Sequence, residues 1–246
     1  MISDDDRLAA DLAAEAGRRL LALRAAGGAA DELRRAGDRS SHEFLAAELA
    51  RQRPGDAVLS EEGADDLARL SADRVWIVDP LDGTREFGEP GRSDWAVHVA
   101  LWERGELTAG AVALPAQDKV LSTADPAKPP ASPPGTLRLL VSRTRPPEFM
   151  TRLARELGAE LVPMGSAGAK AAAVICGDAE AYVHSGGQYE WDSAAPVAVA
   201  VASGLHASRI DGSKLSYNQA KPSLPDILIC QAALADPLLE AISSVR

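Results

Sequence analysis

The chain is poor in cysteine, in aromatic residues and in long apolar stretches. Two cysteines occur among 246 residues, and both Cys176 and Cys230 stand in apolar segments. We therefore expect reduced core thiols in a reducing cytoplasm, not a disulfide framework. Aromatic residues make up 4% of the chain and hydrophobic residues 46%, so Ala, Leu and Val must fill most of the core. No run of about 18 apolar residues occurs, which argues against a membrane span, and the acidic N-terminus lacks the apolar stretch of a secretory signal.

Acidic residues outnumber basic ones, 36 to 26. The formal net charge is −10, so a long polyanion such as nucleic acid is not the expected partner. A small phosphate ester remains open, because a bound metal ion can reverse the sign of the local potential. The length allows one large domain or two intimately packed ones.

Five prolines between Asp125 and Gly135 mark a linker or exposed loop that divides the chain. Before it, residues 1–130 predict an α+β part with a large antiparallel sheet. After it, residues 136–246 alternate strand and helix, which predicts an α/β part with a mixed or parallel sheet. The expected helices begin at Ser3, Ser40, Pro147, Ser166 and Asp192, and the expected strands are 57–59, 75–78, 95–102, 107–114, 137–141, 160–163 and 181–184.

The segment from Trp76 to Thr84 carries the clearest chemical signal. Three apolar residues run into Asp79-Pro80, which predicts a buried strand that breaks at the proline. Asp79 and Asp82 lie on either side of the break, where burial and mutual repulsion would make both hard to ionise. A cation between them would remove both costs, and oxygen ligands without His or Cys favour Mg²⁺ over Zn²⁺. The alternative is an exposed turn, since Asp, Pro and Gly are ordinary turn residues.

Three other acidic residues attract attention by position. Glu61 follows the strand 57–59, and neighbouring strand ends would bring it next to Asp79 and Asp82. Asp192 precedes an Ala/Val helix, where an N-cap is the simpler reading. Asp38 precedes the helix expected at Ser40 and, taken alone, reads as a solvated residue.

Together, Glu61-Glu62, Asp79-Pro80-Leu81-Asp82-Gly83-Thr84 and Trp191-Asp192-Ser193-Ala194-Ala195 resemble the lithium-sensitive, Mg²⁺-dependent inositol monophosphatase superfamily. The resemblance spans Asp38 to Asn218 and implies a layered α-β-α-β-α sandwich of the sugar-phosphatase type. Within the superfamily, Leu59-Ser60-Glu61-Glu62, Gly165-Ser166 with Lys170, and Glu190-Trp191-Asp192 look most like the bacterial 3′(2′),5′-bisphosphate nucleotidases. Those enzymes remove the 3′-phosphate of adenosine 3′,5′-bisphosphate, a by-product of sulfate assimilation.

The resemblance implies a role for each matching residue. One Mg²⁺ would be held by Glu61, Asp79 and the Leu81 carbonyl, a second by Asp79, Asp82 and Asp192, and a looser third near Glu61 and Glu62. The implied catalytic residues are Asp38, Thr84 and Glu61, with Thr84 hydrogen-bonded to Asp38 so that it positions the attacking water. The implied substrate contacts are Gly83, Thr84, Ser142, Arg143, Gly165, Ser166, Lys170 and Asp192. A homodimer is typical of the superfamily.

Two departures from the family pattern bear on these roles. The family usually has Thr-x-Ala-Asp, whereas this chain has Arg34-Arg35-Ala36-Gly37-Asp38 and lacks the threonine, so the pairing of Asp38 with Thr84 is the weakest assignment. Ser185 stands where inositol phosphatases often carry a glutamate. The missing glutamate argues against an inositol-selective pocket. Arg143 and Lys170 can also be read as solvated cations.

Three functions therefore stay open at this point. The first is a nucleotidase acting on adenosine 3′,5′-bisphosphate, and on its 5′-phosphosulfate. The second is a broader phosphatase for inositol 1-phosphate or fructose 1,6-bisphosphate. The third is a non-catalytic relative that binds a nucleotide or a partner.

Overall fold

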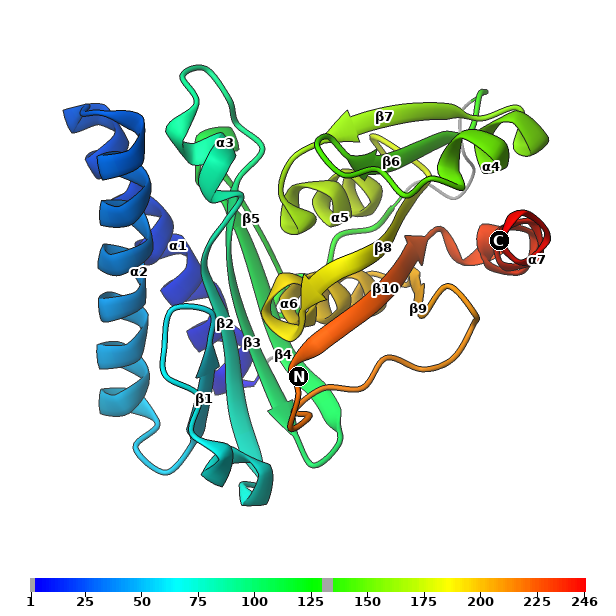
Figure 1. Ribbon diagram of the computed structural model, residues 1–246. Coiled ribbons are helices and arrows are strands. Elements are labelled where there is room, and N and C mark those ends of the chain that lie inside the picture. The colour runs from blue at the N-terminus through cyan, green and yellow to red at the C-terminus, as the bar shows by residue number, and fades with distance from the viewer. Residues whose placement is uncertain (1–2, 130–134) are drawn as a thin grey trace.

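The chain begins with two antiparallel helices, which cover one face of the first sheet. The computed structural model describes residues 3–129 and 135–246. The layers follow the order helix, sheet, helix, sheet, helix, as the family resemblance implied (Figure 1). The first layer holds α1 (Asp4–Ala26) and α2 (Ala30–Gln52), the middle layer α5 (Ala167–Cys176) and α6 (Glu190–Ala202), and the last layer α4 (Met150–Leu157) and α7 (Ala235–Val245).

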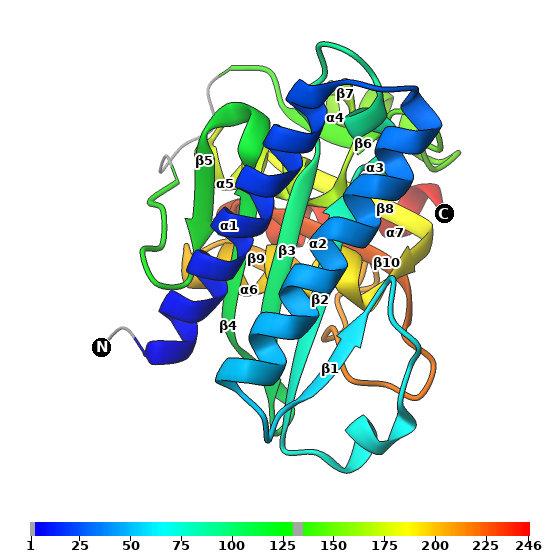
Figure 2. The same ribbon diagram turned by 90° about the vertical axis from the view of Figure 1, so that its left-hand side faces the viewer.

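The first sheet is formed by five strands in chain order. These are β1 (Ala57–Ser60), β2 (Arg74–Asp82), β3 (Ala96–Glu103), β4 (Glu106–Leu114) and β5 (Lys119–Ser122). β1 and β2 are parallel, and the other pairs are antiparallel. Figure 2 shows α1 and α2 lying across this sheet. The large antiparallel sheet predicted for the N-terminal part is confirmed.

The second sheet has the strand order β7-β6-β8-β10-β9. Its strands are β6 (Arg138–Ser142), β7 (Glu160–Met164), β8 (Ala181–Tyr189), β9 (His206–Ser208) and β10 (Ser223–Cys230). β6 is parallel to β7 and β8, whereas β10 is antiparallel to β8 and β9. The sheet is therefore mixed, as the alternation of strands and helices predicted. The remaining helical elements are short: α3 (Thr84–Gly88) and the 3₁₀ turns Leu67–Ser71, Pro115–Gln117 and Ala232–Leu234.

The start of the second helix differs from the prediction. α1 begins as expected, with the Ser3 side chain accepting from the Asp6 amide. α2 begins at Ala30, ten residues before Ser40. Its N-cap, Ala29, offers no side-chain hydrogen bond, so the sequence carries no capping signal there, and the capping-box pattern at Ser40 lies inside the helix. Asp38 is therefore a mid-helix residue.

The second strand also runs further than predicted. β2 continues through Pro80 to Asp82 instead of stopping at Asp79. The pairing with β3 shifts register between Asp79 and Asp82. A shift of this kind leaves a residue outside the ladder, so the missing N–H of Pro80 breaks no pairing.

The middle helices explain why small residues dominate the composition. α6 lies between the two sheets and contributes Ala194, Ala195 and Val199 to the core that also contains residues of both sheets. A Cβ atom on Gly110 of β4 would lie 2.7 Å from the Cβ of Ala198. The helix and the sheet can approach this closely only because both contacting residues are small.

The proline-rich segment includes residues 130–134, which lie outside the described residues. The division of the chain at this segment stays a prediction. Within the described residues, the helices are all too short or too polar to cross a membrane.

Candidate active site

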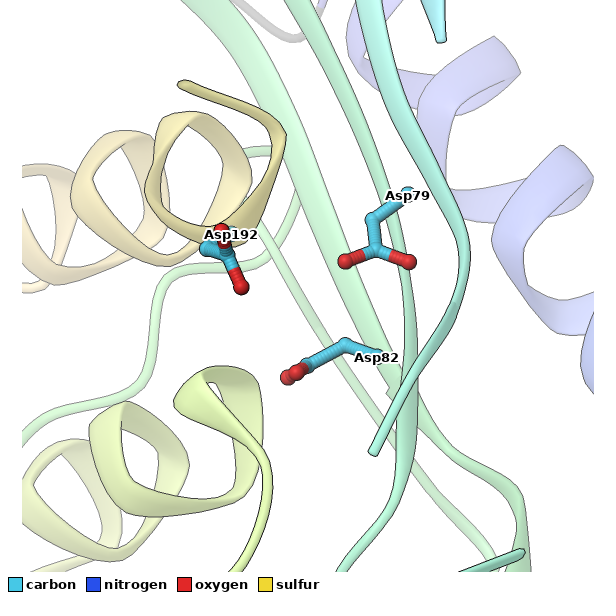
Figure 3. A group of neighbouring side chains, drawn as sticks. All are labelled: Asp79, Asp82 and Asp192. Carbon is cyan, nitrogen blue, oxygen red and sulfur yellow. The ribbon is translucent and has the colours of Figure 1, made fainter. Parts of the chain in front are cut away.

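Three aspartates from two layers of the sandwich face one another. Asp79 and Asp82 lie on β2, and Asp192 lies in the first turn of α6 (Figure 3). One carboxylate oxygen from each lies within 4.8 Å of the others. The structure thus brings together residues that are 110 positions apart, as the family resemblance implied.

Asp79 is held rigidly at the register shift of β2. The residue is 1% exposed, and its Oδ1 accepts a hydrogen bond from the Leu81 amide at 3.0 Å. Burial, together with the charges of Glu61, Asp82 and Asp192, raises the pKa of Asp79 well above its ordinary value. The protein therefore places a carboxylate where it is costly to ionise without a counter-charge.

Asp82 has the opposite electrostatic environment. Its Oδ2 accepts hydrogen bonds from the Ser166 hydroxyl and, at 2.7 Å, from the Gly168 amide, and it lies 3.2 Å from Nε2 of His98. Burial opposes ionisation, but His98 and the two hydrogen-bond donors hold the pKa of Asp82 at about 2. His98 in turn lies 3.0 Å through Nδ1 from the Trp191 carbonyl, the residue before Asp192, and so connects two of the aspartates.

Glu61 lies beside this cluster because β1 and β2 are parallel. Ser60 pairs with Val78, and the Glu61 amide donates to the Val78 carbonyl at 3.4 Å. The predicted meeting of the two strand ends is therefore confirmed. The residue as a whole is exposed, but its carboxyl lies against Asp79. Desolvation of that carboxyl, with the charges of Asp192 and Asp82, raises the pKa of Glu61 to about 7.

Asp192 is not the N-cap of its helix. It is the third residue of α6, and its Oδ2 accepts from the Tyr189 amide at 2.7 Å. The hydrogen bond fixes the side chain toward the cluster, where burial and the charge of Asp82 raise the pKa of Asp192 to about 6. The capping interpretation was wrong because the helix begins two residues earlier, at Glu190.

The donor set fits a hard divalent cation. All four side chains, Glu61, Asp79, Asp82 and Asp192, offer carboxylate oxygens, which Mg²⁺ and similar ions prefer. The raised pKa values of Glu61, Asp79 and Asp192 reflect uncompensated negative charge, and a dication would offset it.

The structure contains the hydrogen bond expected between Thr84 and Asp38. Thr84 Oγ1 lies 3.2 Å from Oδ1 of Asp38 and 2.9 Å from the Leu81 carbonyl. Asp38 reaches this position from the middle of α2. Burial and the charge of Glu62 raise the pKa of Asp38 to about 6, although the hydrogen bond to Thr84 opposes this.

A cavity of about 220 Å³ opens beside the cluster. Asp82 and Asp192 line it, whereas Asp79 and Glu61 do not. All the predicted substrate contacts also line it, namely Gly83, Thr84, Ser142, Arg143, Gly165, Ser166, Lys170 and Asp192. The structure therefore gathers the whole predicted set on one surface.

Several of these residues already have protein partners. Arg143 donates to Glu86 at 2.6 Å and to Glu89 at 3.0 Å. Lys170 is 4% exposed, and its ammonium donates to the carbonyls of Met164, Gly165 and Ser166. Burial lowers the pKa of Lys170 to about 8. Neither is therefore the solvated cation of the simpler interpretation.

The Gly165 amide donates to Oδ2 of Asp94 at 2.7 Å. A side chain at Gly165 would overlap Glu86. Glycine is therefore required here by the close approach of α3 and the loop before α5.

The site residues that the sequence did not predict include His98, Arg145, His184 and Gln188. Three of them line the cavity, and His98 lies behind Asp82. Each comes from a strand or loop that carries no motif, so only the folded arrangement places them. Arg145 is exposed and has no carboxylate partner in the part of the chain that the structure describes.

Comparison with known proteins agrees with the geometry. The model of the inositol monophosphatase family matches residues 7–244. The "3′-phosphoadenosine 5′-phosphate phosphatase" of Mycobacterium bovis is 56% identical over 239 residues, which cover 93% of this chain and 90% of the relative. The "3′(2′),5′-bisphosphate nucleotidase CysQ" of Salmonella typhimurium is 30% identical over 200 residues, covering 74% of this chain and 78% of the relative.

A solved structure shows the same fold. The crystal structure of CysQ from Bacteroides thetaiotaomicron is 26% identical, with a TM-score of 0.80, and covers 91% of this chain and 96% of the other. The sandwich predicted from the resemblance is thus confirmed by both the layers and the comparison. The family model matches nearly the whole chain, and the chain therefore belongs to the inositol monophosphatase family.

Proposed function

We propose that this protein is a Mg²⁺-dependent phosphatase that removes the 3′-phosphate of adenosine 3′,5′-bisphosphate, and of its 5′-phosphosulfate, in sulfate assimilation. The observation that carries the proposal is the 56% identity to a phosphatase named for this bisphosphate, over 93% of the chain. The acidic cluster beside a polar cavity supports it. A phosphatase of this kind needs metal-binding carboxylates next to a substrate pocket.

Two or three Mg²⁺ ions would be held by Glu61, Asp79, Asp82, Asp192 and the Leu81 carbonyl. Bound ions of this kind lower the pKa of water and stabilise the charge that develops on the leaving oxygen. The Leu81 carbonyl accepts a hydrogen bond from Thr84, and its second lone pair is left for an ion. Inhibition by Li⁺ belongs to the same proposal.

Thr84 and Asp38 would position the water that attacks phosphorus. The Thr84 hydroxyl has one proton, which is directed to Asp38 or to the Leu81 carbonyl. Its oxygen lone pairs are then free to accept a hydrogen bond from water. Above a pH of about 6, Asp38 is ionised, so it can accept the Thr84 proton and strengthen this arrangement.

The remaining assignments concern the substrate and the setting. Gly83, Ser142, Arg143, Gly165, Ser166 and Lys170 stay predicted substrate contacts, although Gly165 and Lys170 also hold the surrounding loop. The free thiols Cys176 and Cys230 suit a reducing cytoplasm, where we place the enzyme. The homodimer stays a prediction.

The test is phosphate release from micromolar adenosine 3′,5′-bisphosphate, inositol 1-phosphate and fructose 1,6-bisphosphate, each with Mg²⁺. We expect a strong preference in kcat/KM for the nucleotide, lost with EDTA and with millimolar Li⁺. Equal rates on the sugar phosphates would identify a broader phosphatase. Absence of both turnover and Mg²⁺ binding would identify a non-catalytic relative.

A further inference from the structure

The wall of the cavity formed by β8 contains two buried polar atoms without a hydrogen-bond partner. They are Nδ1 of His184 and Oε1 of Gln188. Both residues line the cavity, and they are only 4% and 6% exposed. Leaving buried polar atoms unpaired costs free energy, so a cavity wall that keeps two of them on one strand is suited to pair them with a ligand.

The hydrogen bonds of His184 define what its free nitrogen can do. Nε2 lies 2.7 Å from the Gly186 carbonyl. A carbonyl can only accept, so Nε2 carries the proton and Nδ1 is an acceptor in the neutral ring. Burial, with the nearby charges of Lys170 and Arg145, lowers the pKa of His184 to about 4. The ring is therefore neutral near pH 7.

Gln188 presents a second acceptor. Its Nε2 donates to the Tyr182 hydroxyl at 2.7 Å, which orients the amide and leaves Oε1 unpaired. Tyr182 also connects the two acceptors, because its ring centroid lies 6.4 Å from that of His184.

The acceptors adjoin the acidic cluster. The Lys170 ammonium lies 5.1 Å from the ring centroid of Tyr182, and it donates to the Ser166 carbonyl. Ser166 itself is hydrogen-bonded to Asp82. Asp82, Asp192, His184 and Gln188 line the same cavity, so a substrate whose phosphate lies at the aspartates could place another of its groups against His184 and Gln188.

We propose that His184 and Gln188 form a subsite that accepts hydrogen bonds from a neutral O–H or N–H donor of the substrate. Two acceptors repel a phosphate or carbonyl oxygen, so the subsite selects against these groups. This inference rests on the proposed nucleotide substrate, which offers two such donors: the ribose 2′-hydroxyl and the exocyclic amine of adenine.

The test compares three substrates on the full chain with Mg²⁺: adenosine 3′,5′-bisphosphate, its 2′-deoxy analogue and inosine 3′,5′-bisphosphate. The deoxy analogue lacks the hydroxyl, and inosine replaces the amine with a carbonyl oxygen. We expect kcat/KM to fall about 10-fold to 100-fold for at least one analogue, since a buried acceptor is then left unpaired. The analogue that falls identifies the donor.

Variants assign the effect to the two side chains. His184→Phe and Gln188→Met each remove one acceptor. We expect the ratio of kcat/KM for adenosine 3′,5′-bisphosphate to kcat/KM for the discriminated analogue to shrink about 10-fold in these variants. His184→Asn keeps an oxygen where Nδ1 lies and is expected to restore part of the discrimination, and it replaces His184→Phe if that variant does not fold. His206→Phe is the matched control, because His206 lies on β9, away from the cavity, and pairs with Ser208.

The outcomes separate this inference from the proposed function. Equal kcat/KM on all three substrates would overturn the donor subsite and leave the phosphatase proposal intact. Hydrolysis of none of them would overturn the phosphatase proposal and, with it, the subsite. Variants that lower kcat/KM equally for all three substrates would show a structural role for β8 and overturn the subsite.

Discussion

Replacing Asp82 with asparagine should remove a metal ligand and leave the fold in place. Oδ2 of Asp82 accepts from Ser166 and Gly168 and lies next to His98. Ser166 and Gly168 both donate to this oxygen, so the oxygen of the asparagine amide must take this position, and its NH₂ group must face the cluster. An NH₂ group cannot bind a cation.

The magnitude follows from binding linkage. An ion at 100 times its dissociation constant stabilises the native state by about 2.7 kcal/mol. For a chain of 246 residues, each kcal/mol raises Tm by roughly 2–4 °C, so Mg²⁺ should raise the Tm of the native protein by roughly 5–10 °C. In Asp82→Asn we expect Mg²⁺ to raise Tm by less than about 1 °C under the same conditions. Without Mg²⁺ the variant should be less stable than the native protein by about 1–3 kcal/mol at pH 7, because the lowered pKa of Asp82 means that its neighbours stabilise the ionised carboxylate.

Thermal unfolding with and without Mg²⁺, together with phosphate release, checks this prediction. Asp226→Asn is the control, because Asp226 pairs with Arg209 in the second sheet, away from the cluster, and should keep the full Mg²⁺ shift. Asp82→Ala should be less stable than Asp82→Asn by about 1–3 kcal/mol, since it leaves buried donors unpaired. The reasoning is refuted if Asp82→Asn keeps both the Mg²⁺ shift and normal turnover.

Three further predictions rest on single contacts. Gly165→Ala should lower the free energy of unfolding by about 1–3 kcal/mol in urea titrations, because its methyl group overlaps Glu86. Gly55→Ala, whose methyl group meets open space, should leave it unchanged. His184 binds a proton more readily in the unfolded chain, since its pKa is about 4 when folded against 6.5 when unfolded. The contribution of His184 to stability therefore falls as the pH drops from 6.5 towards 4. Between pH 7 and pH 5 the native protein should lose about 2 kcal/mol more of its free energy of unfolding than His184→Asn loses. Arg145→Ala should raise KM for adenosine 3′,5′-bisphosphate about 10-fold and leave KM for adenosine 3′-monophosphate unchanged if Arg145 binds the second phosphate; equal KM changes for the two nucleotides would contradict that role.

The acidic cluster was predictable because local rules place its members. A buried apolar strand that runs into Asp79-Pro80 places the carboxylates of Asp79 and Asp82. The short strand before Glu61 places a third carboxylate. Parallel strands end at the same edge of a sheet, so these groups had to meet once β1 and β2 paired. Asp192 needed the family motif, since periodicity alone gave only a helix start.

The surroundings of the cluster were not predictable in the same way. His98 and His184 stand in strands among apolar residues, and nothing in the local sequence separates a site histidine from one that is merely buried. The start of α2 was missed because Ala29 leaves no capping signal, whereas Ser40 imitates one. β10 and α7 were also missed. Their partners lie far away in the chain, so the contacts that stabilise them leave no local pattern.

The position of α6 between the two sheets has a consequence for local opening of the fold. Residues of this helix belong to a core shared by both sheets, so neither sheet can separate without exposing the same apolar helix. Backbone amides of β2 and β8 should then exchange their hydrogens with solvent in one cooperative event, at similar rates, despite lying in different halves of the chain. Either half expressed alone would lose that protection.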